Sequence, residues 1–532
     1  MIVDPADLPA DAVIDADVCI VGGGPAGITI ALELMNERSR IVLLESGGLK
    51  ARDADKSLNE GISIGAPYYA LDACRMRALG GSTNMWGGWC RPLDADDFHP
   101  RDWIADSGWP FDLSELTSAY RRAQTACGLG PYDYDPARWR DDTGASPFAS
   151  DDRALDVMFQ IAPVRFGAEH AEALRKASNV TLLPGASALT LEMDEAGRNA
   201  RRIRVGTLPG KTLTIAAGTI VLAAGGLENA RLLLASTGHG ANGIGNAGDL
   251  VGRYFSDHLH VPIGMLYPRD HSTQHWYEAR RRAGTTVREA LSLTESARGE
   301  ERLLGAAVTF HNADDPHDVL SPALEHSGYK SFMVLARALR DVEWPEDARS
   351  HIARALRNPA NALSMAYRRL STPPATRLMI GVRAEQAPNY ASRVSLDDST
   401  DRYGVRRLRL DWKISDQDLD SIERTQRILA TLFAAERVEM IPRDGPLGWS
   451  NAIAPGAHHI GTTRMHASPQ RGVVDAQCRV HGTENLYVAG SSVFPTGGWA
   501  PPTLTIVALS LRLATHLKHR LARPAYEAIR PA

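Results

Sequence analysis

A glycine-rich stretch near the amino terminus restricts the possible fold more than any other feature of the chain. Residues 16–48 read ADVCIVGGGPAGITIALELMNERSRIVLLESGG. An apolar, strand-like run ends at Val21, a glycine cluster opens a helical stretch, and a second apolar run ends at Glu45. This order of strand, glycines, helix, strand and acid predicts a βαβ unit that binds a dinucleotide.

The glycines stand where such a unit needs residues without a side chain. Gly22 suits the tight turn, Gly24 lets a pyrophosphate approach the backbone, and Gly27 lets the helix pack closely on the strand. The amino terminus of the helix then offers free N–H groups and the positive end of its dipole to the phosphates. Glu45 is placed to accept hydrogen bonds from both hydroxyls of an adenosine ribose.

Length and charge narrow the functional classes. A chain of 532 residues exceeds the size of one hydrophobic core, so two or three packed domains are expected. The formal net charge of -4 offers no basic surface to nucleic acid and no polybasic anchor to a membrane. No export signal or membrane-spanning run is evident, and the five cysteines are scattered without a metal-binding or disulfide spacing. We therefore expect a cytoplasmic enzyme with free thiols, without nucleic acid, membrane or metal as a partner.

Two later segments are predicted to return to the nucleotide-binding sheet. Residues 219–236, TIVLAAGGLENARLLLAS, combine a buried strand with an apolar helix. Residues 485–516 begin with a strand that ends at Gly490, and Pro501-Pro502-Thr503 then opens a long apolar helix. Three separate pieces of chain are expected to build one sheet.

These segments, with RALGGSTNMWGGWCRP at 77–92, resemble the glucose-methanol-choline (GMC) family of FAD-dependent oxidoreductases. The resemblance extends to residues 385–412, which are similar to the family's substrate-domain sheet. It implies an α/β, Rossmann-like FAD-binding domain that is discontinuous, and an α+β substrate-binding domain whose antiparallel sheet covers the flavin. The implied ranges are 1–100, 176–262 and 452–523 for the FAD-binding domain, and 101–175 and 263–451 for the substrate-binding domain.

A variable insertion at about 265–375 belongs to the substrate-binding domain on this interpretation. It contains helical-looking amphipathic stretches and a basic run at Arg280, Arg281 and Arg282. We interpret it as a solvated helical excursion or a subunit contact in preference to a ligand site.

The resemblance also implies which positions bind FAD. Met85 stands where several family members carry a histidine bonded to the flavin, so we expect FAD to be held noncovalently. Trp86 resembles the pattern of the pyranose-oxidase-like bacterial branch and would stack near the isoalloxazine, with core packing as the alternative. The full implied set is Gly22, Gly24, Pro25, Ala26, Gly27, Glu45, Ser46, Gly81, Ser82, Asn84, Met85, Trp86, Ala224, Gly490, Ser491, Pro501, Pro502 and Thr503.

Two adjacent histidines open the segment HHIGTTRM at 458–465. In the family a histidine three positions before the Gly-Thr turn lies beside the flavin, and that position is His458. Oxidation removes a proton from the alcohol oxygen and a hydride from its carbon, and a neutral imidazole with a pKa of ~6.5 suits the first task. We expect His458 to be the base, and flavin reduction to slow as the pH falls through that pKa. His459, the second candidate, is expected to point elsewhere and to be structural.

Pro501 is a departure from the family, which offers a second His or Asn at this position. Proline has neither a side-chain donor nor an N–H, so it cannot orient a substrate hydroxyl. Either His459 or a residue of the insertion replaces it, or one base suffices, or the chemistry is not alcohol oxidation.

Three functions are compatible with these features. FAD-dependent oxidation of an alcohol group on a sugar, glycoside or related polyol is favoured, with hydride transfer to the flavin and oxygen or another electron acceptor as the second substrate. A non-redox lyase on the same fold is the alternative that Pro501 supports. A flavoprotein scaffold without turnover is disfavoured because His458 is present.

Overall fold

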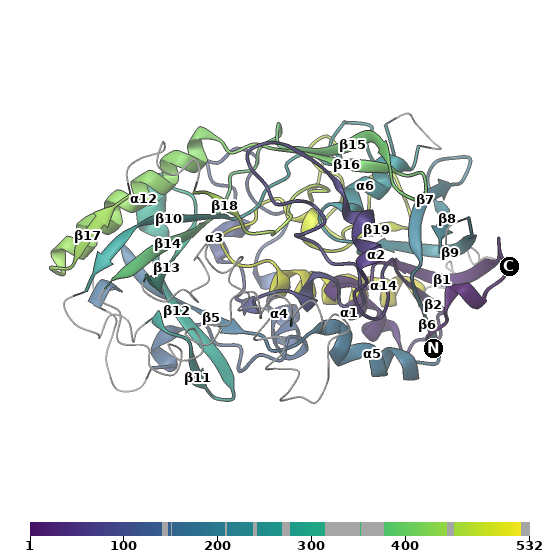
Figure 1. Cartoon of the computed structure of the whole chain (residues 1–532), viewed down its shortest axis with the longest axis horizontal. Coiled ribbons are helices and arrows are strands. Elements are labelled where there is room, and N and C mark those ends of the chain that lie inside the picture. Colours follow the sequence, from purple (N-terminus) through teal and green to yellow (C-terminus); the bar gives the residue numbers. More distant parts are fainter. Residues whose placement is uncertain are drawn as a thin grey trace.

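The structure is a computed structural model with two large sheets at opposite ends of an elongated molecule (Figure 1). It describes residues 1–140, 147–149, 152–207, 210–237, 242–268, 277–313, 352, 377–443 and 452–522. The helices of that part of the chain are α1 (Pro25–Leu34), α2 (Asp53–Lys56), α3 (Ala95–Phe98), α4 (Ser114–Ala126), α5 (Phe166–Lys176), α6 (Glu228–Ala235), α8 (Glu295–Glu300), α12 (Asp416–Ala435) and α14 (Thr503–Leu521).

The first sheet has seven strands and contains the predicted βαβ unit. Its order is β6-β2-β1-β9-β8-β7, with β19 also paired to β9. β6, β2, β1, β9 and β19 pair with one another in parallel, whereas β8 is antiparallel to both β9 and β7. Its strands are β1 (Val13–Val21), β2 (Ile41–Glu45), β6 (Val180–Pro184), β7 (Ser187–Met193), β8 (Ala200–Gly206), β9 (Thr212–Leu222) and β19 (Leu486–Val488).

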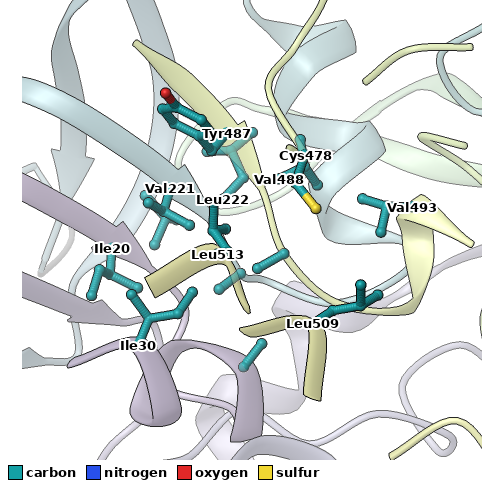
Figure 2. Close-up of a cluster of buried hydrophobic side chains, with 14 of the residues drawn as sticks. Ile20, Ile30, Val221, Leu222, Cys478, Tyr487, Val488, Val493, Leu509 and Leu513 are labelled. Carbon is teal, nitrogen blue, oxygen red and sulfur yellow. The ribbon is translucent and has the colours of Figure 1, made fainter. Parts of the chain in front are cut away.

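Segments from both ends of the chain form one hydrophobic core on this sheet. Ile20 of β1, Val221 of β9 and Val488 of β19 pack with Leu509 and Leu513 of α14, as Figure 2 shows. All five side chains are at most 3% exposed. The prediction that three separated segments build one sheet is therefore confirmed.

The second sheet has nine strands and is antiparallel in the pairings that the structure describes. Its order is β17-β10-β14-β13-β12-β5-β4, with β11 also paired to β12 and β18 to β10. Its strands are β4 (Trp89–Cys90), β5 (Ala154–Ile161), β10 (Leu259–Tyr267), β11 (Arg280–Arg282), β12 (Thr285–Leu293), β13 (Ala306–Asn312), β14 (Leu378–Ala384), β17 (Glu439–Pro442) and β18 (Ala454–Pro455).

The two faces of the nine-stranded sheet differ in composition. Alternate residues such as Val261 of β10 and Ile380 of β14 form a hydrophobic core with Leu429 of α12, which lies along the outer face (Figure 1). Because strand side chains alternate in direction, the intervening residues of β10 and β14 project from the opposite face. That opposite face carries polar side chains, among them His260 and Arg383.

Residues 385–412 do not belong to the large antiparallel sheet, which corrects the expectation from the sequence. They form β15 (Arg393–Thr400) and β16 (Arg406–Trp412), which pair with β3 (Gly61–Gly65) in a separate three-stranded sheet. Residues 61–65 lie more than 300 positions earlier in the chain, so no local pattern in 385–412 could identify this partner.

Two helices from the range assigned to the substrate-binding domain pack against helices of the FAD-binding domain. α4 and α5 fall within 101–175 or at its edge, yet α4 packs against α14, and α5 packs against α1. The described part of the insertion, 277–313, forms mainly strands and one short helix, so the helical interpretation is wrong there. Residues 269–276, 314–351 and 353–376 of the insertion lie outside the described residues.

The five cysteines are all buried free thiols. Within the described ranges, the helices lack the combination of length and apolar character that crossing a bilayer requires.

Candidate functional site

Three loops of the seven-stranded sheet converge at one edge. β1, β9 and β19 are parallel neighbours, so their carboxyl ends lie together. The Ala223 N–H donates to Val21 O at 2.8 Å, and the Ala489 N–H donates to Leu222 O at 2.7 Å. These bonds bring the loops that follow Val21, Leu222 and Val488 side by side. This edge is where open α/β sheets bind their ligands.

The glycine loop has the close contacts that its sequence predicted. Gly22 has a φ of 114°, and a Cβ built there would lie 2.5 Å from Ala223 O. A Cβ at Gly27 would lie 1.9 Å from Gly22 O, so the first turn of α1 packs directly on the loop. At Gly24, by contrast, a Cβ would meet nothing within 4 Å. Pro25 and Ala26 follow as the first residues of α1.

Glu45 is buried and holds this loop in place. Its Oε2 accepts a hydrogen bond from Gly23 N at 2.9 Å, and its Oε1 accepts one from Gly47 N at 2.7 Å. Burial raises the pKa of Glu45, while the two backbone donors and the charge of Arg77 oppose that shift. Each carboxylate oxygen has a second lone pair, so both can also accept from a ribose hydroxyl. Ser46 lies one residue on, and its Oγ accepts from Arg77 at 2.7 Å.

Residues 81–86 form a second wall against the glycine loop. A Cβ at Gly81 would lie 3.1 Å from the Cα of Gly24, so the two backbones touch. The side chains of Ser82 and Met85 are exposed, and Asn84 donates to the carbonyl of Leu79 at 2.9 Å.

Trp86 packs against the core of the seven-stranded sheet. Its ring is half-buried there, and its indole N–H donates to Val164 O at 3.1 Å. The core-packing alternative therefore describes the contacts of Trp86 in this structure.

The third wall comes from the carboxyl-terminal segment. Gly490 has a φ of 109° and open space beside it, and the Ser491 hydroxyl donates to His459 O at 2.7 Å. Pro501 and Pro502 are buried, and Thr503 begins α14 with no side-chain cap. The free N–H groups at this end of α14 are therefore available to a negatively charged partner.

These walls fit a dinucleotide. Cβ atoms at Gly24, Gly225 and Gly490 would enter open space, whereas the backbone around Gly22 and Gly27 is packed. Ala224 lies in the same loop as Gly225, and its N–H donates to the side-chain oxygen of Asn229 at 2.8 Å. A loop of open glycines at the amino terminus of a ten-residue helix suits a pyrophosphate.

The two adjacent histidines point to different surroundings. The ring of His459 is buried, with Nε2 3.7 Å from the Cys74 sulfur and its centroid 6.1 Å from that of Tyr68. His458 is partly exposed, and its Nδ1 lies 2.8 Å from Nδ1 of His258. The structure therefore separates the pair as the sequence predicted, but it does not place His459 across from His458.

His258 is the residue beside His458 that the sequence interpretation missed. It lies immediately before β10, in the run SDHLH, and 200 positions separate it from His458. Its Nε2 lies 2.9 Å from the carbonyl oxygen of Gly498, close to the start of α14. The alternating histidines at 258 and 260 are the signal that could have drawn attention to this position.

The hydrogen bonds of His258 fix the tautomers of both rings. A carbonyl oxygen can only accept, so His258 Nε2 carries the proton that binds Gly498 O. In the neutral ring Nδ1 of His258 is then an acceptor, and His458 Nδ1 must be the donor of the 2.8 Å bond. The remaining nitrogen of His458, Nε2, is therefore left with its lone pair unprotonated.

Asp257 holds the backbone on which both rings are mounted. Its Oδ1 accepts from the backbone N–H groups of His258 at 2.7 Å and of His458 at 2.8 Å. Its Oδ2 accepts from the Tyr68 hydroxyl at 2.5 Å. Burial raises the pKa of Asp257 to about 6, and these hydrogen bonds oppose the shift.

All the histidines of this cluster are held neutral. Burial lowers the pKa of His458 well below its usual value, and the neighbouring histidines and Arg383 add to that effect. Burial, assisted by Arg383, also lowers the pKa of His258 to about 3 and that of His260 well below its usual value. Burial and the charge of Arg75 lower the pKa of His459 to about 3.

Comparison with known proteins identifies two matching families. The family described as FAD dependent oxidoreductase matches residues 17–320, which is more than half of the chain, and the family described as GMC oxidoreductase matches residues 388–510. The 6'''-hydroxyparomomycin C oxidase of Streptomyces lividus is 24% identical over 95% of this chain and 92% of its own length. The C-glycoside 3-oxidase of Microbacterium trichothecenolyticum is 32% identical over 27% of this chain and 28% of its own.

Solved structures share the fold over nearly the whole chain. Pyridoxine 4-oxidase from Mesorbium loti has a TM-score of 0.54 at 18% identity and covers 95% of this chain and 99% of its own. A fungal aryl-alcohol oxidase has a TM-score of 0.57 at 15% identity and covers 96% and 100%.

Proposed function

Because the chain belongs to the GMC family of FAD-dependent oxidoreductases, we propose that it oxidises an alcohol group on a sugar, glycoside or related polyol. Relatives named as paromamine 6'-oxidase and C-glycoside 3-oxidase support the carbohydrate-like substrate class. One observation carries the catalytic part of the proposal. Nδ1 of His258 lies 2.8 Å from Nδ1 of His458, and this hydrogen bond fixes the tautomer of His458.

FAD, when bound, supplies the hydride acceptor that oxidation of an alcohol requires. The glycine loop, Glu45 and the amino terminus of α1 hold its dinucleotide part, as the open space at Gly24 suggests. Met85 has no nitrogen with which to form the histidyl linkage known in the family, so FAD is held noncovalently.

His458 takes the proton of the substrate hydroxyl. Its Nε2 lone pair is available because its Nδ1 proton is committed to His258. The same bond stabilises the ring as it becomes positively charged, since Nδ1–H then donates more strongly. General-base assistance of this kind contributes roughly 10²- to 10⁴-fold to a rate.

His258 supplies the second polar side chain beside the base that Pro501 cannot supply. Pro501 is buried and has no donor, whereas His258 reaches His458 directly. His258 orients the base and does not itself accept the substrate proton, because its Nε2–H is bound to Gly498 O at 2.9 Å. The relatives reported above are named as oxidases, which gives the lyase alternative no support.

An anaerobic screen of sugars, glycosides and simple alcohols tests this function. A substrate should bleach the visible absorbance of the flavin without oxygen and yield the corresponding carbonyl compound. His458→Ala should retain FAD yet slow flavin reduction by about 10² or more, equivalent to ~2.7 kcal/mol. His459→Ala is the matched control and should cost much less. Carbonyl formation or C–C cleavage without bleaching would replace oxidation with the lyase reaction.

A further inference from the structure

An arginine that forms no ion pair with the described residues lies on the sheet face beside the histidine cluster. Arg383 is on β14, where Leu378, Ile380 and Val382 pack under α12. The side chain of Arg383 therefore projects from the opposite face. In register it lies beside His260 of β10.

Arg383 is held in position by aromatic rings and one histidine. Its guanidinium carbon lies 4.9 Å from the ring centroid of Trp89 and 5.5 Å from that of Phe159. Its Nε donates to Nε2 of His260 at 3.2 Å, and the His260 ring centroid lies 6.3 Å from that of His458. The guanidinium is thus one imidazole away from the proposed base.

No carboxylate of the described residues pairs with Arg383, and its Nη1 is buried without a hydrogen-bond partner among them. Two other buried arginines, by contrast, are paired: Arg231 with Asp401 at 2.7 Å, and Arg298 with Asp96 at 2.5 Å. Burial lowers the pKa of Arg383 to about 10, and the like charge of Arg288 adds to this.

An unpaired guanidinium in such a position is costly, because burying a charge without a partner sacrifices its hydration. The cost falls when a ligand supplies the negative charge. The Nε is already occupied by His260 and Nη1 is enclosed, so Nη2 is the guanidinium donor that remains for an oxygen of a carboxylate. Trp89 and Phe159, whose ring centroids are 4.9 Å apart, contact the guanidinium together and restrict its orientation.

We propose that Arg383 binds a carboxylate of the substrate, so that the enzyme oxidises a hydroxyl group on a molecule that is also an acid, such as a sugar acid or its glycoside. This inference rests on the proposed alcohol oxidation and adds its substrate class. A neutral sugar leaves the charge of Arg383 uncompensated, and an amino sugar adds a second positive charge beside it. The carboxylate-bearing sugar is therefore preferred over both.

Binding of a simple carboxylate tests the site without turnover. FAD-loaded enzyme is titrated with sodium acetate or with acetamide at constant ionic strength, followed by the flavin absorbance and by the melting temperature. Acetate should bind about 10- to 100-fold more tightly than acetamide, and stabilise the protein accordingly. Equal affinities in the wild-type enzyme would overturn the proposal, whatever the variants do.

Two matched substitutions assign the effect to Arg383. Arg383→Lys keeps the charge but replaces the planar guanidinium with an ammonium group that cannot keep the Nε bond to His260 and offer Nη2 at the same time, and should weaken acetate binding at least about tenfold. Arg288→Lys is the control, because Arg288 also contacts Trp89, 5.2 Å from its ring centroid, and donates to the carbonyls of Tyr277 and Phe310. A larger loss in the Arg288 variant would refute the assignment.

Turnover separates this inference from the proposed function. Methyl β-D-glucuronide, methyl β-D-glucoside and methyl β-D-glucosaminide are compared by anaerobic flavin reduction. The glucuronide should have a second-order rate constant at least about tenfold higher, and Arg383→Gln should abolish that preference by lowering the glucuronide rate at least about tenfold more than the glucoside rate. Some loss on the glucoside is also expected, because the charge of Arg383 helps to keep the pKa of His458 low. Equal losses for the glucuronide and the glucoside would show that Arg383 supports the reacting oxygen instead. If no alcohol reduces the flavin while acetate still binds through Arg383, the proposed function fails and the carboxylate site stands.

Discussion

Replacing His258 with phenylalanine removes the acceptor that fixes the tautomer of His458. His258 is 1% exposed, so the phenyl ring that replaces it is also buried. Bulk water therefore cannot take over the role of His258 Nδ1 as the acceptor. His458 Nδ1–H then loses its 2.8 Å hydrogen bond, and the proton can move to Nε2, where it blocks the base.

The size of the effect follows from the cost of an unsatisfied buried donor. Leaving such a group unpaired costs ~1–3 kcal/mol, which disfavours the active tautomer by a factor of about 5 to 150. Flavin reduction should slow by that factor, because only the active tautomer accepts the substrate proton. Substrate affinity should change less, since His258 is proposed to contact His458 and not the substrate.

Anaerobic stopped-flow reduction of the FAD-loaded variants measures this directly. His258→Gln is the rescue variant, because its amide can accept from His458 and donate to Gly498 O, and it should recover most of the rate. His459→Phe is the control for a buried neighbouring imidazole and should change the rate less than threefold. In a His458→Ala background, His258→Phe should have little further effect, because the two residues act as one unit.

Two results would refute this reasoning. The first is a His258→Phe rate within twofold of wild type at full flavin occupancy. The second is an equal loss in the Phe and Gln variants with lowered melting temperature in both, which would give His258 a purely structural role.

Three further outcomes are expected. The rate of flavin reduction should be nearly constant between about pH 6.5 and 8 and fall only in more acidic solution, because burial lowers the pKa of His458 and so keeps the base neutral down to lower pH; a fall centred near pH 6.5, as the sequence alone suggested, would contradict this. FAD should be released by acid or heat precipitation, since Met85 cannot form a histidyl bond, and flavin that stays on the denatured chain in a gel would show a covalent link. Gly24→Val should lower FAD occupancy, because the valine side chain fills the open space beside the glycine loop. Glu45→Ala should weaken FAD retention, because it removes hydrogen bonds to the loop and to the ribose. Full FAD occupancy in both purified variants would contradict the assignment of the nucleotide site.

The sequence was most informative where structure depends on neighbouring residues. The βαβ unit at 16–48 and the helix that begins at Thr503 follow from apolar periodicity, glycine spacing and helix-start residues, all of which act over a few positions. The Gly22 and Gly27 contacts follow as well, because the strand-to-helix turn brings their backbones together whatever the rest of the chain does.

Local sequence patterns did not predict which strands pair. Residues 385–412 were expected to be part of the substrate-domain sheet; they contain the strands β15 and β16, but β16 pairs with β3 at Gly61–Gly65. A strand's own pattern reports which face is buried and not which distant strand completes its hydrogen bonds.

The catalytic neighbourhood shows the same division. The family resemblance singled out His458, and His459 was expected to point elsewhere, since adjacent residues of an extended segment point in opposite directions. The identity of the group beside His458 depends on where β10 lies, and His258 is 200 positions away in the chain. The charge beside that pair depends on β14, whose alternation places Arg383 on the histidine face. Sequence alone therefore determined the nucleotide-binding unit, because its signals are local, and the family resemblance proposed His458 as the base. Tertiary structure decided which histidine and which positive charge lie beside His458, because sheet pairing between distant strands brings them together.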